Sequence, residues 1–217
     1  MVRVTAEDGF TFDAYEARPE AGSKGGLVIL QEIFGVTDQM KSVARKYAEQ
    51  GYDAIVPALF DRAAPKTVVP FSEGPRGLEI AKSLNPDQTK MDIAASAKAV
   101  DTGKGVSVLG FCLGGGQALR MAQGLELTSA IAFYGTRLQT ILGAPLKCPM
   151  MFHFGETDDH SPPEVIEAVR VAIPEAEIHL YPAGHAFAND ARDTYVADAA
   201  KLAHERTITF LNKHHNA

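Results

Sequence analysis

The chain has 217 residues, of which 46% are hydrophobic and 22% charged, with a formal net charge of -6. The length suits one compact domain, 1–217, and the composition is that of an ordinary globular protein. The negative charge argues against nucleic acid or a membrane surface as a partner, because both bind basic proteins. No apolar run is long enough to span a membrane, and the alternating N-terminus lacks the apolar stretch of a signal peptide, so a cytoplasmic protein is expected.

Apolar runs alternate with amphipathic segments along the chain. Strands are predicted at 2–5 and 10–15, which flank a turn at Asp8-Gly9, and at 27–31, 53–56, 105–109, 129–133, 150–154 and 177–181. Helices are predicted at 37–50, 92–100, 113–124, 162–173 and 194–213. This alternation predicts an α/β fold with a mostly parallel sheet and helices on both faces.

Two local signals refine these elements. Thr37 can cap the first helix, whose apolar face holds Met40, Val43, Ala44 and Tyr47, and Gly51 can end it. Segment 61–85 is rich in proline and glycine, and we expect a loop with short helical content there.

The most informative segment is VSVLGFCLGGG at 106–116, where an apolar strand leads through G-x-C-x-G into a helix. This is the nucleophile-elbow pattern with cysteine in place of serine. The pivot, Cys112, should have a strained backbone, and Gly110 and Gly114 lack side chains because strand and helix approach closely. The helix N-terminus favours a thiolate at Cys112.

Other interpretations of Cys112 stay open. It could be a small core residue, and the glycines could serve packing or a phosphate cradle. A dinucleotide or P-loop site fits poorly, because GFCLGGG is not GxGxxG and no Lys-Ser/Thr pair follows it. A redox role with Cys148 is conceivable, although Cys148 lies just before a buried strand.

An elbow predicts an acid and then a histidine on loops after later strands. Asp158 follows the strand at 150–154, and His185 follows the strand at 177–181. Asp158 could instead cap a helix, but Asp159 or Ser161 is better placed for that. His160 is a rival base, disfavoured because it lies two residues from the proposed acid.

An oxyanion hole needs two N–H donors. Leu113 follows the nucleophile, and Ile33 lies after an early strand, so we expect these two residues to supply the donors. Glu32 at the end of that strand is either a solvated residue or a polar partner of the thiol.

Metal and cofactor binding are not expected. Two cysteines are too few for a disulfide framework, and the seven histidines include no HExxH or HxH pattern. The pair His214-His215 reads as a frayed helix end.

With these residues the chain resembles the dienelactone hydrolase (carboxymethylenebutenolidase) family over nearly its whole length. The motifs that carry the resemblance are QEIFGV at 31–36, GYDAIVPALFDR at 51–62, GFCLGGG at 110–116, FYG at 133–135, FHFGETD at 152–158 and AGHAFA at 183–188. The resemblance implies an α/β-hydrolase fold, a Cys112-Asp158-His185 triad and an active-site glutamate at Glu32. It also implies cofactor-free hydrolysis of an unsaturated lactone to maleylacetate-type products, in a small cytoplasmic protein that takes part in catechol breakdown.

The chain departs from the family pattern where a substrate carboxylate would be held. The dienelactone-specific members of the family that this chain resembles have serine and arginine at the positions that Ala186 and Asn189 occupy here. Arg76 corresponds weakly to a further arginine of the family, and Tyr134 is retained. We take Phe34 together with these four residues as candidate substrate-binding positions.

The leading hypothesis is a monomeric cysteine-dependent hydrolase of a small lactone or carboxylic ester. The alternatives are peptide cleavage by the same triad, a non-catalytic ligand-binding protein on a hydrolase scaffold, and a thiol redox protein. Peptide cleavage is disfavoured because so short a chain has little insertion from which to build a peptide cleft. A binding protein is disfavoured because no triad member is missing.

Overall fold

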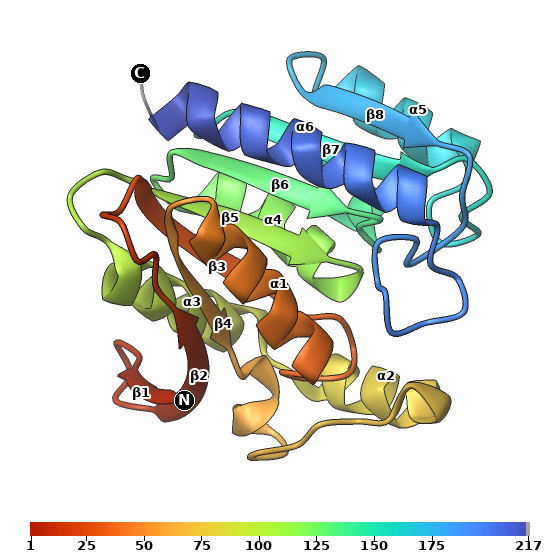
Figure 1. Ribbon diagram of the computed structural model, residues 1–217. Coiled ribbons are helices and arrows are strands. Elements are labelled where there is room, and N and C mark those ends of the chain that lie inside the picture. Colours follow the sequence, from red (N-terminus) through yellow and green to blue (C-terminus); the bar gives the residue numbers. More distant parts are fainter. Residues whose placement is uncertain (216–217) are drawn as a thin grey trace. The chain divides into compact units, whose positions relative to one another are not determined.

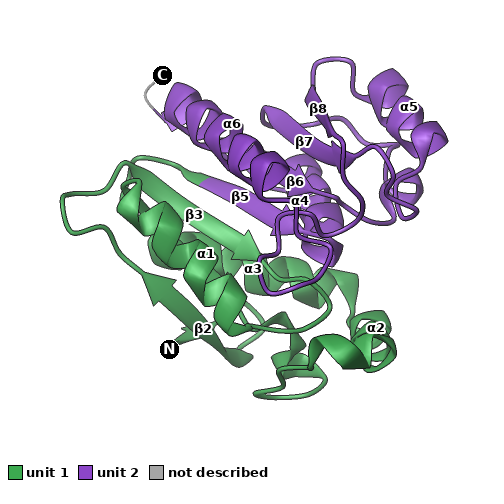
Figure 2. Ribbon diagram, turned by 45° about the vertical axis from the view of Figure 1, so that its right-hand side comes forward, with its two compact units in different colours: residues 1–106 green, residues 107–217 purple. Residues whose placement is uncertain are grey.

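The structure is a computed structural model that describes residues 1–215. The chain divides into two compact units, 1–106 and 107 onward, drawn in two colours in Figure 2. The single domain over 1–217 stays a prediction.

Four strands form the sheet of the first unit, in the order β1-β2-β4-β3. They are β1 (Val2–Thr5), β2 (Thr11–Ala17), β3 (Gly25–Leu30) and β4 (Tyr52–Pro57). β2 runs antiparallel to both β1 and β4, whereas β3 and β4 are parallel. Every residue of β3 and β4 is buried, as the continuous apolar runs predict.

Two long helices pack on this sheet, α1 (Asp38–Glu49) and α3 (Pro86–Val100). Figure 1 shows α1 in front of the strands and α3 behind them. The Thr37 hydroxyl accepts the Met40 N–H at 3.2 Å and so caps α1 as predicted, and Gly51 ends it at a φ of 99°. The face predicted from Met40, Val43, Ala44 and Tyr47 is buried.

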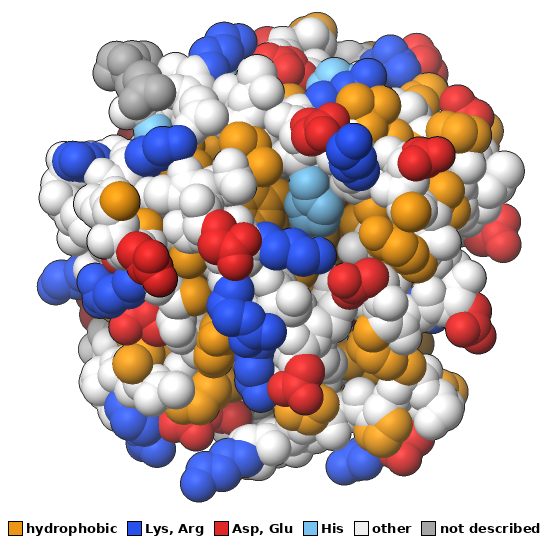
Figure 3. Space-filling model, in the orientation of Figure 1, with side chains coloured by type: hydrophobic (Ala, Val, Ile, Leu, Met, Phe, Trp, Pro, Cys, Tyr) orange, Lys and Arg blue, Asp and Glu red, His pale blue; other side chains and the backbone are white. Residues whose placement is uncertain are grey.

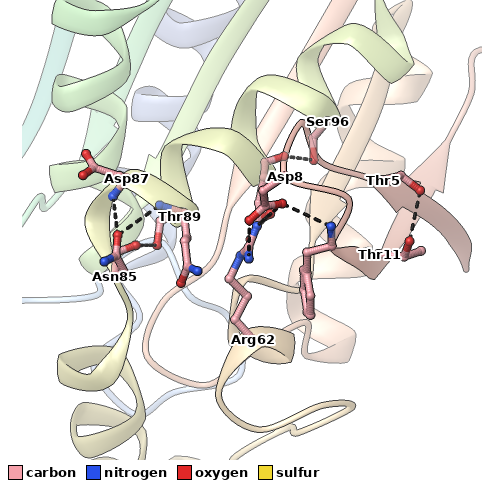
Figure 4. A network of polar contacts seen from close by, with 11 residues as sticks. Thr5, Asp8, Thr11, Arg62, Asn85, Asp87, Thr89 and Ser96 are labelled. Atoms are coloured by element: carbon pink, nitrogen blue, oxygen red, sulfur yellow. Dashed lines mark hydrogen bonds and ion pairs between the residues drawn. The ribbon is translucent and has the colours of Figure 1, made fainter.

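Segment 61–85 is more helical than predicted. It contains the end of a 3-10 helix (Leu59–Arg62), a second one (Phe71–Glu73) and the ten-residue helix α2 (Gly74–Ser83). Pro75 is tolerated because it lies in the first turn of α2, where its missing N–H has no helical partner. The next helix starts at Pro86 rather than at 92, because the Asn85 side chain accepts the N–H groups of Asp87 and Gln88 (Figure 4).

An ion-pair network fixes the N-terminal hairpin to the rest of the first unit (Figure 4). Arg62 binds Asp92 at 2.7 Å and Asp8 at 2.9 Å, and its guanidinium lies 4.3 Å from the ring centroid of Phe10. The Arg62 side chain is nearly buried, so these contacts are shielded from water and satisfy a charge that would otherwise be costly to bury.

The sheet of the second unit is entirely parallel, in the order β5-β6-β7-β8. Its strands are β5 (Val106–Phe111), which begins at the last residue of the first unit, β6 (Ser129–Phe133), β7 (Met150–Gly155) and β8 (Glu177–Tyr181). The first three are buried throughout, whereas β8 is partly exposed.

Three helices connect or follow these strands: α4 (Leu113–Gly124), α5 (Pro163–Ala172) and α6 (Ala197–His215). α4 packs against β6 from one side, and α6 packs against β6 and β7 from the other (Figure 1). The prediction of an α/β fold with mostly parallel strands and helices on both faces is therefore confirmed.

Three further observations concern possible partners. In the part of the chain that the structure describes, no helix is long and apolar enough to cross a membrane. Residues 1–215 also hold no group of three or more His, Cys, Asp or Glu side chains arranged to bind a metal ion. On the face drawn in Figure 3, acidic and basic side chains are interspersed with uncharged ones.

Candidate active site

Cys112 lies between β5 and α4 with a φ of 54° and a ψ of -113°. Such a conformation is unfavourable for a residue with a Cβ and costs on the order of 1–3 kcal/mol. Backbone hydrogen bonds hold it there: the Cys112 N–H donates to the Phe133 carbonyl at 3.0 Å, and the Thr136 N–H donates to the Cys112 carbonyl at 3.1 Å. The strained pivot predicted from the elbow is confirmed, and Cys112 is partly exposed.

Glycine is required before the pivot because the backbones meet. A Cβ at Gly110 would overlap the Gly114 carbonyl, and a Cβ at Gly115 would lie 2.7 Å from the Cα of Gly135. The first contact brings the end of β5 against the start of α4. The second brings α4 against the loop that follows β6.

Asp158 and His185 form a hydrogen-bonded pair. His185 Nδ1 lies 2.8 Å from Asp158 Oδ2, and the other carboxylate oxygen accepts the His160 N–H at 2.8 Å. The Asp158 side chain is fully buried, so these two bonds satisfy both of its oxygens. A carboxylate can only accept, so it keeps a proton on Nδ1 and leaves Nε2 of a neutral His185 as a proton acceptor.

The loops that carry the acid and the base are joined through their backbones. The Glu156 N–H donates to the Tyr181 carbonyl at 2.8 Å, and the Thr157 N–H donates to the Ala183 carbonyl at 3.1 Å. A Cβ at Gly155 would overlap the Ala183 carbonyl, so the loops touch where β7 ends. The register of the parallel pair β7–β8 thus continues into the two loops and sets the spacing of acid and base.

Backbone strain is concentrated near these residues. The described chain has five non-glycine residues with positive φ, and three of them are Cys112, Tyr134 (38°) and Ala186 (61°). Strained residues often occur at functional sites, where surrounding contacts hold them in place. Tyr134 is buried, and its ring lies 5.2 Å from that of His185.

The two candidate substrate-binding residues after His185 lie below the surface. Ala186 is fully buried and Asn189 is 1% exposed. The Asn189 side-chain oxygen accepts the Ala191 N–H at 3.1 Å, and the backbone N–H of Asn189 donates to the Ala186 carbonyl at 3.0 Å. These bonds stabilise the turn that follows the histidine.

Four further predicted site residues, Glu32, Ile33, Phe34 and Arg76, belong to the first unit, on the segment after β3 and on α2. Glu32 is buried, and Phe34 packs edge-on against Phe71 at 4.8 Å. A Cβ at Gly77 would overlap the Ile33 carbonyl, so α2 lies directly on this segment. The pairing of Ile33 with Leu113 as an oxyanion hole stays a prediction.

Arg76, the candidate carboxylate-binding cation, lies on α2 and is exposed. Its guanidinium donates to Glu73 at 3.0 Å. A substrate carboxylate would therefore have to compete with an acid that Arg76 already binds.

Sequence reasoning misassigned the residues between the acid and α5. Neither Asp159 nor Ser161 caps α5, whose N-cap is Pro162 without a side-chain hydrogen bond. The Ser161 hydroxyl instead donates to the Gly135 carbonyl at 2.8 Å, linking the acid loop to the loop after β6. The helix begins at Pro163, one residue later than expected, so Ser161 lies outside the N-cap position.

A buried hydrogen-bonded chain under the base loop was also missed. The Thr207 hydroxyl donates to the Ala203 carbonyl, so it accepts from His153 Nε2 at 2.9 Å. His153 Nδ1 then accepts the Tyr181 hydroxyl proton at 2.8 Å. Complete burial lowers the pKa of His153 well below its ordinary value, which keeps the ring neutral, as this chain requires.

Comparison with known proteins gives a consistent result. The family model described as the dienelactone hydrolase family matches residues 12–215. The carboxymethylenebutenolidase of Pseudomonas putida is 33% identical, with 97% of this chain and 94% of that protein aligned. Carboxymethylenebutenolidase 1 of Cupriavidus pinatubonensis is 30% identical, with 97% of this chain and 95% of that protein aligned.

Solved structures share the fold. A Klebsiella pneumoniae protein provisionally called a dienelactone hydrolase superposes with a TM-score of 0.86 at 26% identity, and 97% of each chain is covered. An esterase from Pyrococcus furiosus has a TM-score of 0.73 at 16% identity, with 99% of this chain and 91% of that one covered. The chain has an α/β-hydrolase fold and belongs to the dienelactone hydrolase family.

Proposed function

We propose that this protein is a cysteine-dependent hydrolase of a small lactone or carboxylic ester, with Cys112, His185 and Asp158 as its triad. The observation that carries the proposal is the 2.8 Å hydrogen bond between His185 and a fully buried Asp158, in the same unit as a cysteine at a strained strand-to-helix turn. Family membership supports a hydrolase, and the carboxymethylenebutenolidase relatives support an ester or lactone as the substrate class.

In the first half of the proposed reaction, His185 Nε2 takes the thiol proton, and the Cys112 sulfur attacks the substrate carbonyl carbon. The carbonyl oxygen becomes an oxyanion, for which the N–H groups of Ile33 and Leu113 are the proposed donors. When the oxyanion collapses, the ester C–O bond breaks and the protonated His185 gives its proton to the departing oxygen. A thioester on Cys112 remains.

In the second half, His185 takes a proton from water while the water oxygen attacks the thioester carbonyl. The C–S bond then breaks, the protonated His185 returns its proton to the departing Cys112 sulfur, and the carboxylic acid product leaves. Asp158 stays ionised throughout, holds the proton on Nδ1 and stabilises the imidazolium that forms twice in the cycle. No cofactor takes part in this scheme.

A redox role for the two cysteines receives less support. Burial and the nearby Glu126 raise the pKa of the Cys148 thiol to about 11, so little of it is ionised at neutral pH.

We propose a monomeric cytoplasmic enzyme that takes part in the breakdown of aromatic compounds, because the mechanism needs a reduced thiol and the relatives are carboxymethylenebutenolidases.

The experiment is hydrolysis of a panel of chromogenic esters and lactones, with product analysis after incubation with dienelactone. We expect turnover that disappears when Cys112 is alkylated and persists in Cys148→Ala. Turnover that survives complete alkylation of Cys112 would refute the cysteine mechanism, and silence across the panel would favour a binding protein.

A further inference from the structure

We propose that His160 is a positioning residue that keeps the His185 ring on Asp158. This inference rests on the proposed function, because it assigns His185 the role of base. The His160 and His185 ring centroids are 4.4 Å apart at an interplanar angle of 58°. The Tyr134 ring contacts His185 as well, with ring centroids 5.2 Å apart and an interplanar angle of 67°. The rings of His160 and Tyr134 therefore both pack on His185, in addition to its hydrogen bond to Asp158.

The Tyr134 ring is part of the protein interior. Tyr134 is fully buried, and its N–H donates to the His153 carbonyl at 2.7 Å. Its ring also contacts Phe111 at 6.0 Å and Phe187 at 5.4 Å. Packing on several sides leaves this ring little freedom to move, so it provides a fixed surface for His185.

The His160 ring differs from the Tyr134 ring, because the His160 side chain is exposed. Its backbone, however, is fixed by hydrogen bonds. The His160 N–H donates to Asp158 Oδ1 at 2.8 Å, and the next residue, Ser161, donates its N–H to the Asp158 carbonyl at 3.1 Å. The Ser161 hydroxyl then binds the Gly135 carbonyl, beside Tyr134. These bonds place the Cα of His160 relative to both Asp158 and the Tyr134 segment.

The arrangement accounts for the low exposure of the base. The His185 side chain lies on a loop yet is only 16% exposed. If the His160 ring is removed, one side of the imidazole opens to water, which can compete for the bond to Asp158 and allow the ring to rotate. Misplacement of a catalytic group by about 1 Å can cost on the order of 100-fold in rate, and we expect a partial loss of about tenfold here.

The test compares His160→Ala with His160→Phe, and Asp159→Ala serves as the neighbouring control on the same exposed loop. We expect His160→Ala to lower kcat for a neutral ester about tenfold while KM stays within about twofold, because His160 acts through His185 and not on the substrate. His160→Phe restores a ring of similar size, so kcat should recover to within about threefold. Asp159→Ala should behave like the wild type.

A second measurement separates this inference from the proposed function. Alkylation of Cys112 by iodoacetamide at pH 7 needs no substrate, and it should slow in His160→Ala and recover in His160→Phe. Unchanged kcat and labelling in His160→Ala would overturn the inference, as would a His160→Phe variant no better than His160→Ala. A rise in KM alone would also overturn it, since His160 would then be a substrate contact. The proposed function fails separately if Cys112→Ala retains wild-type turnover.

Discussion

The two cysteines of the chain lie in the same unit and have opposite surroundings. Cys112 is at a strained turn between β5 and α4, partly exposed and at the N-terminus of a helix. Cys148 is buried two residues before β7, and its pKa is raised to about 11. Backbone geometry and access to water therefore distinguish a candidate nucleophile from an inert core residue of the same type.

The largest expected effect is the loss of turnover when the Cys112 thiol is removed, and it tests this comparison directly. We expect Cys112→Ala to lower turnover by on the order of 10⁴ or more, because the reaction loses its nucleophile. Cys112→Ser should also be nearly inactive, since a hydroxyl ionises far less readily than a thiol. Steady-state hydrolysis of a chromogenic ester measures both, with Cys148→Ala as the matched control expected near wild type. The comparison collapses if Cys148→Ala is the inactive variant, or if Cys148 is alkylated before Cys112 at pH 7.

A second difference in the same unit concerns neighbouring aspartates. Asp158→Asn should lower kcat by on the order of 10⁴, because an amide can donate to Nδ1 and so favours the wrong tautomer of His185. Asp159→Asn should change kcat little, because Asp159 is exposed and makes no bond to the base. Comparable activity in the two variants would show that the acid has been assigned to the wrong residue.

A smaller effect is expected in substrate choice. A carboxylated dienelactone needs a cation or several donors, and one lost charged hydrogen bond costs roughly 1.5–3 kcal/mol, about tenfold to a hundredfold in binding. Asn189 is buried in a turn and Arg76 is paired with Glu73, so we expect kcat/KM for the dienelactone to be lower than for a neutral ester of similar size. A strong preference for the dienelactone that survives Arg76→Ala would mean that other groups hold the carboxylate.

In the same substrate comparison, Asn189→Arg should specifically lower KM for the dienelactone if the new guanidinium reaches the pocket. The variant must also give up the side-chain hydrogen bond to the Ala191 N–H. Its thermal stability therefore has to be measured alongside its kinetics.

The smallest expected effect concerns the pH dependence of stability and the buried His153. Burial lowers the pKa of His153 well below 6.5, whereas the unfolded chain takes up a proton near 6.5. The unfolded state therefore binds more protons below that pH, and the free energy of unfolding should fall as the pH falls from about 6.5, by at most about 1.4 kcal/mol per pH unit for this one group. His179 and His214, whose pKa values burial also lowers, add in the same direction.

Urea unfolding between pH 7 and pH 5 would measure this slope. His153→Asn should flatten it, whatever the effect of the substitution on absolute stability. An equal slope in wild type and His153→Asn would contradict the assignment of a neutral buried ring.

The sequence was sufficient where a local rule has one physical solution. The G-x-C-x-G spacing predicted the strained Cys112, and the overlap that a Cβ at Gly110 would cause shows why that glycine is needed. Composition misled in segment 61–85, because Gly74 and Pro75 are tolerated in the first turn of α2. The packing of Tyr134 and His160 on His185 was not predictable, since it depends on tertiary contacts between loops far apart in the chain.

The backbone bonds between the acid loop and the base loop have a consequence for local opening of the native state. Glu156 and Thr157 donate to carbonyls on the segment that leads to His185, so neither loop can detach without exposing polar groups of the other. A fluctuation that releases one loop should release both, and closing should restore both in a single step. The enzyme would then alternate between having its acid–base pair and lacking it, with little time spent holding half of it.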